Sequence, residues 1–435
     1  MKRKWWIVGI LVFLELLVCG GILLTMWLGR TAFEGVRFFY RADTHLEETV
    51  EETFVVDGPA VLDLETDFGD VTVTGSQGTE VQVIARLSLW GSDEEDARQQ
   101  VDVQMTQEGN RINVWVVRPE RAYVGFASTR SLQVDFEIRV PSETSLHLVT
   151  SSGDLMVNGV TGLVELETDF GNIEVEAVSG PVSAQSDSGD LTFIGLSHGG
   201  DLEVETNFGQ LVLRDITADS LTARSDSGDI QVDGITLDGA LDLRTNFGSV
   251  TVQDVAAERL TAHSDSGDIQ VEDATLDGAL DLETNFGKVT ADGVRATSYR
   301  LKSDSGSLTL DGCSGPLDLQ TNFGDIEVRN ATGATPTLKT DSGKIVFSGS
   351  LDGQGVHRVE NGLGQVHLVL PADAAFDLDA ETDLGSIKTG FAVMMTEFEE
   401  KRIVGQVNGG GPLLQIHTDS GDITLESVTV EPTGR

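Results

Sequence analysis

Apolar and polar residues alternate along most of the chain, and a glycine interrupts the alternation at a fixed place in each stretch. Residues 280–291, LDLETNFGKVTA, contain one copy of the pattern. By the two-residue period of a β-strand, Leu280, Leu282 and Phe286 lie on one face together with a threonine, and the acidic and amide residues lie on the other. The inward face resumes after an odd step across the glycine, so we expect a bend there, for which glycine supplies the torsional freedom. The pattern predicts two short strands joined at a corner.

The pattern recurs along the chain with a period of about 20 residues, which is typical of a repeat array. The chain reads SDSGDIQVDGITLDGALDLRTNFGSVTVQD from residue 225 and nearly repeats this from residue 264, with 22 of 30 aligned positions identical. The corner glycines follow one another at this period, and they are Gly153, Gly171, Gly189, Gly209, Gly228, Gly248, Gly267, Gly287, Gly306, Gly324, Gly343, Gly364 and Gly385. Gly421 closes the series after a longer gap, and Gly69 belongs to an early copy.

Short strands on a fixed period, without the period of a helix, predict an all-β fold of the parallel β-helix or β-solenoid type. Each coil lies about 4.8 Å above the last, so like residues stack on like. Two coil lengths remain open, one period of about 20 residues or two periods of about 39 residues. A coil of one period makes Phe and Ser alternate along one edge, whereas a coil of two periods gives separate ladders of Phe and of Asp-Ser. We favour the coil of one period because the two halves of the repeat align along their full length.

The two ends of the array depart from the pattern. Residues 46–145 predict an irregular β start that caps one edge, and within it SDEEDARQQVDVQM predicts a short helix with Ser92 as N-cap and Glu95 three residues on. The regular array covers 146–428, and 429–435 form a tail. The long gap before Gly421 predicts an excursion that covers the opposite edge, where open strands invite aggregation.

The N-terminal segment predicts a membrane anchor. Residues 5–28 form an apolar run with one charge, Glu15, which is long enough to cross a bilayer of about 30 Å and too long for a cleaved signal. The basic residues before this run favour a cytoplasmic N-terminus. We therefore expect a tip and transmembrane signal anchor over 1–30, a linker over 31–45, and a single-pass cell-membrane protein with its repeat domain outside the cytoplasm.

Charge and cysteine content exclude several classes of protein. The chain carries 29 Lys and Arg against 71 Asp and Glu, a net charge of −42. Without the four basic residues and one acid of 1–30, the remainder carries −42 − (4 − 1) = −45. Such a field repels nucleic acid, so we expect no nucleic-acid partner. Cys19 and Cys313 are the two cysteines, which leaves no disulfide framework or thiolate metal site. Val18 before Cys19 argues against lipidation.

Several segments together resemble a known family. These are the N-terminal anchor, DLETDFGDVTVTG, a short helical insertion, RVPSETSLHLVTSSGDLMVNG, the repeated SGDI units and the final GGGPLLQIHTDSGDITLES. Over 46–428 the chain is similar to the bacterial DUF4097 family of β-strand repeat proteins. The resemblance implies a right-handed β-helix and a role in adhesion or at the cell envelope, and it implies no catalytic residues. The regular alternation with NFG departs from the family pattern.

The acidic corners raise the question of calcium. In SDSGD, Asp226 and Asp229, and likewise Asp265 and Asp268, are hard oxygen donors at a tight turn, and Ca²⁺ takes six to eight oxygens. In a coil of one period, however, the neighbouring corners carry Asn instead of Asp. We interpret these aspartates as turn caps and expect no metal and no cofactor.

Catalytic patterns are missing from the sequence. Acids are so frequent that paired carboxylates carry no information, and the seven histidines have no metal-ligand spacing. No nucleophile elbow, P-loop or dinucleotide fingerprint occurs. The phenylalanines of the NFG corners share the parity of the buried leucines, which favours the core over a carbohydrate-stacking stripe; they are Phe170, Phe208, Phe247, Phe286 and Phe323.

The sequence thus favours a non-catalytic, adhesin-like or scaffold protein of the envelope. Its partners would be envelope or cell-surface proteins or glycans, bound by many weak contacts. One alternative is an envelope-signalling accessory whose anchor pairs with a partner helix through Glu15, where a buried carboxylate is costly. A glycan-active β-helix enzyme is the third hypothesis.

Overall fold

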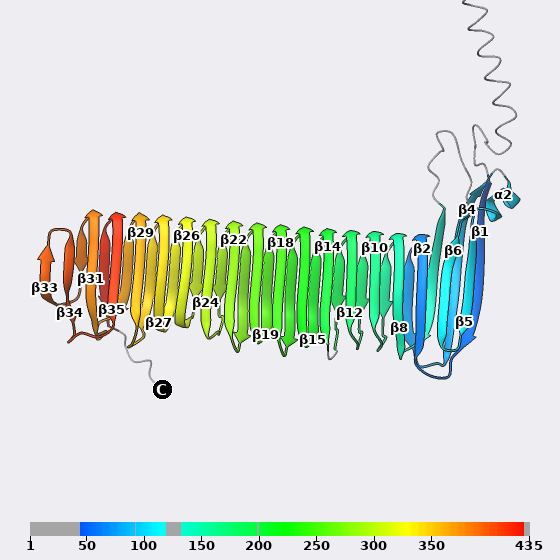
Figure 1. Ribbon diagram of the computed structural model, residues 1–435, viewed down its shortest axis with the longest axis horizontal. Helices are drawn as coiled ribbons and strands as arrows, with labels where there is room; N and C mark the ends of the chain where they lie inside the picture. The colour runs from blue at the N-terminus through cyan, green and yellow to red at the C-terminus, as the bar shows by residue number, and fades with distance from the viewer. Residues whose placement is uncertain (1–43, 92, 119–131, 198–199, 430–435) are drawn as a thin grey trace, which may run out of the picture. The chain divides into compact units, whose positions relative to one another are not determined.

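The computed structural model describes residues 44–91, 93–118, 132–197 and 200–429 (Figure 1). The predicted anchor over 1–30 lies outside these residues, and none of the helices within them is long and apolar enough to cross a membrane. Contacts divide the chain into two compact units. The larger has the described residues 50–85, 105–115, 134–197 and 200–429, and the smaller has 44–49, 86–91, 93–104, 116–118 and 132–133.

The larger unit is a parallel β-solenoid in which each coil rises along one strand and returns along a second (Figure 1). The strands of the first ladder, in spatial order, are β2 (Ala60–Phe68), β8 (Thr144–Ser152), β10 (Val164–Phe170), β12 (Val182–Ser188), β14 (Asp201–Phe208), β16 (Ser220–Ser227), β18 (Ala240–Phe247), β20 (Arg259–Ser266), β22 (Ala279–Phe286), β24 (Ser298–Ser305), β26 (Ser314–Phe323), the second half of β27 (Ile326–Ser342), β29 (Val356–Leu363), β35 (Leu413–Ser420) and β31 (Phe376–Leu384).

The return strands form a second ladder. They are β3 (Val71–Ser76), β9 (Leu155–Asn158), β11 (Ile173–Glu176), β13 (Leu191–Ile194), β15 (Leu211–Ala218), β17 (Ile230–Leu237), β19 (Val250–Ala257), β21 (Ile269–Leu276), β23 (Val289–Asp292), β25 (Leu308–Asp311), the first half of β27, β28 (Ile345–Leu351), β30 (Val366–Pro371), β36 (Ile423–Val428) and β32 (Ile387–Thr389).

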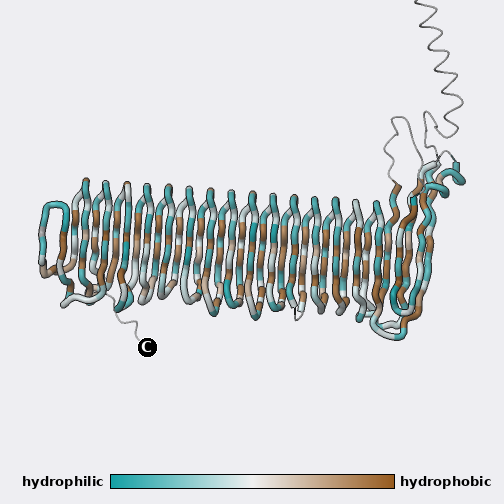
Figure 2. The backbone as a smooth tube through the Cα atoms, viewed as in Figure 1, coloured by the Kyte–Doolittle hydropathy of each residue, from teal (hydrophilic) through white to brown (hydrophobic). Residues whose placement is uncertain are grey.

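Like residues stack on like within each ladder, as the repeat predicts. Leu221 pairs with Leu241, and Leu260 pairs with Leu241 and Leu280 on either side. All four leucines are fully buried, and apolar positions form continuous bands across the strands in Figure 2. This register confirms the parallel β-solenoid with coils of one period and excludes the coil of two periods. The hand of the coil stays a prediction.

The two ends of the solenoid are interleaved, which the sequence period does not predict. Strand β2 lies between β8 and the later strand β6 (Arg111–Val117), and β3 lies between β9 and β7 (Gln133–Pro141). At the other end, β35 and β36 insert between the coil of β29–β30 and the coil of β31–β32. The last coil in sequence is therefore not the last in space.

An antiparallel hairpin follows the outermost coil at the C-terminal end. It consists of β33 (Val393–Glu399) and β34 (Arg402–Val407), and β34 pairs antiparallel with β31. The predicted excursion thus covers this edge, as expected, and replaces a parallel edge that would otherwise remain open.

The smaller unit holds helix α2 (Glu94–Arg98) and parts of the remaining strands, which are β1 (Thr44–Val55), β4 (Glu80–Gly91) and β5 (Asp102–Glu108). The helix forms where the sequence predicts it, and Ser92, the predicted cap, lies outside the described residues. Asp93 is the N-cap, and its Oδ1 accepts from the backbone N–H of Asp96 at 2.9 Å. Aspartate and serine are equally good N-cap residues, so a helix that is capped by Asp93 loses no stability relative to one capped by serine. In the same unit, His45 stacks on Trp90 with ring centroids 4.3 Å apart.

Candidate functional site

From β10 onwards, a side chain at the end of each strand of the first ladder donates a hydrogen bond to the corner glycine of the neighbouring coil. Thr284 is buried, and its Oγ1 donates to the carbonyl of the corner glycine Gly267, 3.0 Å away. Thr245 donates to Gly228 in the same way, and Ser264 to Gly248. Buried hydroxyls are usually hydrogen-bonded, so the stack favours Thr or Ser three residues before the glycine; Thr66 and Thr150, in the first two coils, are exceptions whose Oγ1 has no partner.

Glycine is required at these corners because the coils approach closely. A Cβ on Gly287 would lie 2.1 Å from the carbonyl oxygen of Gly267, and one on Gly248 would lie 2.1 Å from that of Gly228. No side chain fits at such distances. The torsional freedom inferred from the sequence is therefore not the main reason for these glycines; the reason is the backbone contact between successive coils.

The prediction that the corner phenylalanines lie in the core is wrong. Phe170, Phe208, Phe247, Phe286 and Phe323 are 63%, 62%, 63%, 63% and 64% exposed. The two-residue period holds through the buried threonine or serine and fails two residues later. At that point the strand ends at the corner, where stacked glycine backbones close the interior. The phenylalanine side chain, which the two-residue alternation places in the core, points into solvent instead. We call these five residues the Phe ladder.

The Phe ladder alternates with serine in strict register. Phe208 pairs with Ser188 and Ser227, and Phe247 pairs with Ser227 and Ser266. The alternation continues through the interleaved end, where Ser420 lies between Leu363 and Leu384, which are 59% and 71% exposed. Since adjacent strands lie about 4.8 Å apart, neighbouring rungs of the ladder lie about 9.6 Å apart. The solenoid thus carries a row of evenly spaced exposed aromatic rings.

A row of hydrogen-bonding side chains accompanies the rings. Asn246 Nδ2 donates to Asp226 Oδ1 in the preceding coil at 3.0 Å, and Asn285 Nδ2 donates to Asp265 Oδ1 at 3.0 Å. The pairs Asn207–Asp187 and Asn322–Asp304 repeat this bond at 3.0 and 3.3 Å. Each of these bonds uses one of the two amide hydrogens, so the groups left for a ligand are the other N–H, the asparagine Oδ1 and the second carboxylate oxygen.

The calcium candidates are each engaged between coils. Besides Asp226 and Asp265, Asp229 Oδ1 accepts from the backbone N–H of Ser249 at 2.7 Å, and Asp268 Oδ1 accepts from that of Lys288 at 2.7 Å. A coil with asparagine separates Asp226 from Asp265. Among the residues that the structure describes, no group of three or more His, Cys, Asp or Glu is placed to hold a metal.

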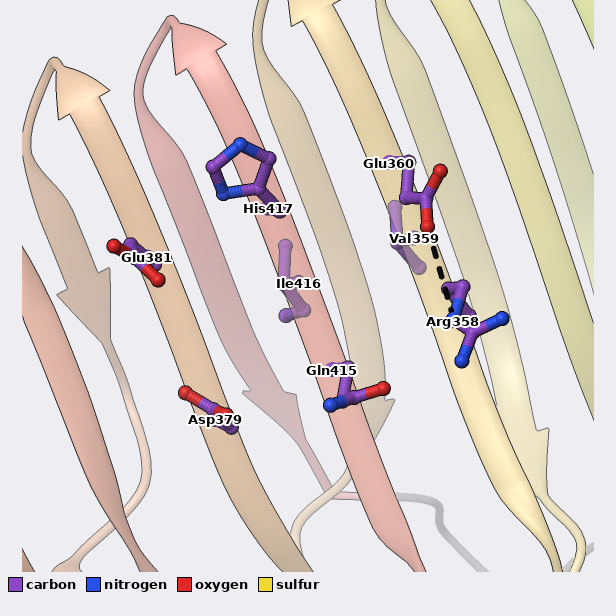
Figure 3. A pocket seen from close by; sticks show the side chains of 8 residues that line it. All are labelled: Arg358, Val359, Glu360, Asp379, Glu381, Gln415, Ile416 and His417. Atoms are coloured by element: carbon purple, nitrogen blue, oxygen red, sulfur yellow. Dashed lines mark ion pairs between the residues drawn. The ribbon is translucent and has the colours of Figure 1, made fainter.

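One shallow hollow lies over β29, β35 and β31, where the C-terminal coil is inserted (Figure 3). Its volume is about 200 Å³, below the range typical of ligand pockets. Its acids are already paired with cations: Glu360 with Arg358 at 3.7 Å, and Asp379 with Arg402 at 3.0 Å. His417, at its rim, contacts the carboxylate of Asp419. The hollow therefore offers no free acid–base pair.

Sequence reasoning missed two polar residues in the core of β29. His357 is fully buried where the neighbouring coil has Leu414, and burial lowers its pKa. Its Nε2 lies 3.1 Å from the carbonyl oxygen of Asp352, and its Nδ1 has no partner. Asn361 replaces the usual corner threonine and donates to Gly343 at 2.9 Å. The alternation along β29 places His357 and Asn361 on the inward face, and this was the signal in the sequence that could have identified them.

The model of one protein family matches most of the chain. The family is described as Toastrack DUF4097, and the matches cover residues 61–312, 241–360 and 280–426. The chain belongs to this family. Membership confirms the resemblance inferred from the repeated SGDI units. No curated protein matches the Toastrack chain.

Solved structures give weaker similarities. A "putative cell adhesion protein" from Clostridium sporogenes is 10% identical, with 88% of this chain and 100% of that chain covered and a TM-score of 0.15. A "putative adhesin" from Bacteroides fragilis is 14% identical, with 65% and 97% covered and a TM-score of 0.26. A "putative lipid binding protein" from Parabacteroides distasonis is 14% identical, with 68% and 96% covered and a TM-score of 0.31. At these scores the similarities support no inference about function.

Proposed function

We propose that this Toastrack protein is a non-catalytic, adhesin-like binding protein of the cell envelope. The N-terminal run over 5–28 anchors it in the membrane, and the solenoid lies outside the cytoplasm and binds its partner through the Phe ladder. The hollow over β29, β35 and β31 does not favour the alternative of a glycan-active enzyme, because it is shallow and its acids are paired.

The exposed Phe ladder is the observation that carries this proposal. A scattered exposed aromatic residue needs no explanation, but five rings at one corner, each about 63% exposed and equally spaced, form a repeated apolar feature on an otherwise acidic surface. Each ring offers a weak contact of its own. A row of equal contacts on a rigid support adds them by effective concentration, which suits adhesion to a repetitive surface.

The repeat itself supplies the test. Deleting Ser225–His263 removes two coils and one rung, and joins Arg224 to the same SDSG sequence that it preceded. The alternation of Phe and Ser then continues unbroken. Full-length protein on beads should bind whole cells and envelope fractions, the deletion should bind more weakly, and replacing all five phenylalanines by serine should abolish binding. Unchanged binding by the five-serine variant would refute a role of the ladder.

Placement in the envelope is tested separately. Protease added to intact cells should degrade the solenoid and spare the N-terminal tip if the chain is anchored as proposed. A solenoid that is protected until the cells are lysed would contradict this orientation.

A further inference from the structure

We propose that the Phe ladder binds an extended, uncharged polysaccharide of the β-1,4-linked type, one disaccharide per rung. This inference rests on the proposed function and names the ligand of the same surface. Three properties of the corner point to it: the spacing of the rings, the hydrogen-bonding character of the row beside them, and the charge of the surrounding surface.

The spacing selects ligands by their repeat. Rungs at about 9.6 Å are close to the length of one disaccharide in an extended β-1,4-linked chain, in which alternate sugar rings present the same face. Each phenylalanine can therefore stack on the apolar C–H face of every second sugar. An extended polypeptide strand repeats about every 6.8 Å and falls out of step with the rungs.

The neighbouring row selects a ligand that both donates and accepts hydrogen bonds. Asn246 uses one amide hydrogen on Asp226, and Asn285 uses one on Asp265, so each amide keeps one donor and its Oδ1 acceptor, and each aspartate keeps its second oxygen. Sugar hydroxyls supply donors at every residue of the chain. A polyproline helix has a similar repeat, about 9.3 Å per turn, but its prolines carry no N–H to give to these acceptors.

The negative charge of the chain argues against other partners for the exposed phenylalanines. The chain carries −42, and the row beside the rings holds Asp187, Asp226, Asp265 and Asp304. Anionic lipid and acidic polysaccharides are repelled by this field. Two copies of the chain placed ladder to ladder would bring their aspartate rows together, and the repulsion between like charges opposes this contact. An uncharged polyol meets none of these penalties.

Affinity for defined oligosaccharides tests the inference. The full-length protein in detergent is titrated calorimetrically with cellohexaose and with N-acetylchitohexaose, which span about three rungs, and with α-1,4-linked maltohexaose as the control of equal size. We expect binding of a β-1,4-linked hexamer and none of maltohexaose. Phe247→Ser should weaken binding to a long β-1,4-linked chain about 2- to 10-fold, and Phe208→Ser with Phe247→Ser and Phe286→Ser should weaken it further.

A second variant tests the spacing without removing a ring. Deleting Ser225–Arg244 takes out one coil of the serine type and places Phe247 directly above Phe208, so all five rings remain but the upper three shift by half a repeat. The affinity for a polymer longer than the hexamers should fall to that of the three phenylalanines that keep their spacing, Phe247, Phe286 and Phe323. The variant that lacks Ser225–His263 keeps the spacing of its four remaining phenylalanines, so each of them should contribute about as much to the affinity as it does in the parent protein.

Several outcomes would overturn the inference. These are no binding of either β-1,4-linked hexamer, equal binding of maltohexaose, or affinity that the serine substitutions leave unchanged. Ladder-dependent self-association in sedimentation, or ladder-dependent binding to uncharged phosphatidylcholine vesicles or to a proline-rich peptide in place of glycan, would also reject it. If glycan binding fails while ladder-dependent adhesion to cells persists, the ligand class is wrong and the adhesive function stands.

Discussion

Asn285 donates a hydrogen bond from Nδ2 to Oδ1 of Asp265, one coil below it, at 3.0 Å. The next carboxylate in the row is that of Asp304, one coil above Asn285. Carboxylates at this corner are thus about 9.6 Å apart instead of about 4.8 Å, with an amide between them. Because Coulomb repulsion falls with distance, the alternation of Asp and Asn lets an acidic solenoid stack without a continuous column of charge.

Replacing this amide by a carboxylate should destabilise the stack. In Asn285→Asp, three carboxylates follow one another at coil spacing, and the bond to Asp265 is lost. We expect the free energy of unfolding to fall by about 1–2 kcal/mol at low salt, and the loss to shrink in about 0.5 M NaCl, where charges are screened. Denaturant titrations of the full-length chain at two salt concentrations measure this.

Asn285→Ala is the matched control, since it removes the same hydrogen bond without adding charge. Its loss of stability should be smaller and should not depend on salt. If both variants respond to salt alike, charge spacing is not the reason for the asparagine.

The Phe ladder should contribute little to stability. Phe247→Ala removes a ring that is already 63% exposed, so we expect a change below about 1 kcal/mol. Leu243→Ala, in the same strand β18, removes a fully buried side chain and should cost about 2–5 kcal/mol. Thermal unfolding of both variants gives the comparison. A large loss for Phe247→Ala would mean that the ring packs in the core after all.

The sequence predicts the coil well and the corner poorly, for one physical reason. The period of two is a property of a straight strand, and Leu280, Leu282 and Thr284 obey it. Phe286 lies where the strand ends, and there the contact between Gly287 and Gly267 decides the direction of the side chain. That contact joins residues one coil apart, which local alternation does not reveal. The aromatic residue that parity assigns to the core becomes the candidate binding residue.

The interleaved ends also lie beyond local reasoning. The copy at Gly69 is visible in the sequence, but only the structure places it directly beneath Gly153. Likewise, the insertion of Ser420 between Leu363 and Leu384 follows from strand pairing across long stretches of chain. Once placed, these residues continue the alternation of large apolar side chains with serine, so the pattern belongs to spatial order and not to order along the chain.

Corner glycines should tolerate no side chain. In Gly248→Ala the new Cβ would lie 2.1 Å from the carbonyl oxygen of Gly228, so the coils must separate at that corner. We expect a loss of several kcal/mol, at the upper end of single substitutions. Gly353→Ala is the control, because a Cβ there meets nothing within 4 Å. Equal stability of the two variants would contradict the close stacking of the corners.

His357 should make the solenoid sensitive to mild acid. Burial holds its pKa below the ordinary value, so the unfolded chain takes up a proton at this residue before the folded chain does. Its contribution is therefore fully present above about pH 6.5 and is lost as the pH falls towards the folded pKa, at up to about 1.4 kcal/mol per pH unit. His357→Leu, which matches Leu414 in the next coil, removes this term and the unpaired Nδ1. The difference in unfolding free energy between variant and parent should grow from pH 7.5 to pH 5.5, while the many carboxylates affect both proteins alike. A difference that stays constant over this range would show that His357 does not titrate below its ordinary pKa in the folded chain.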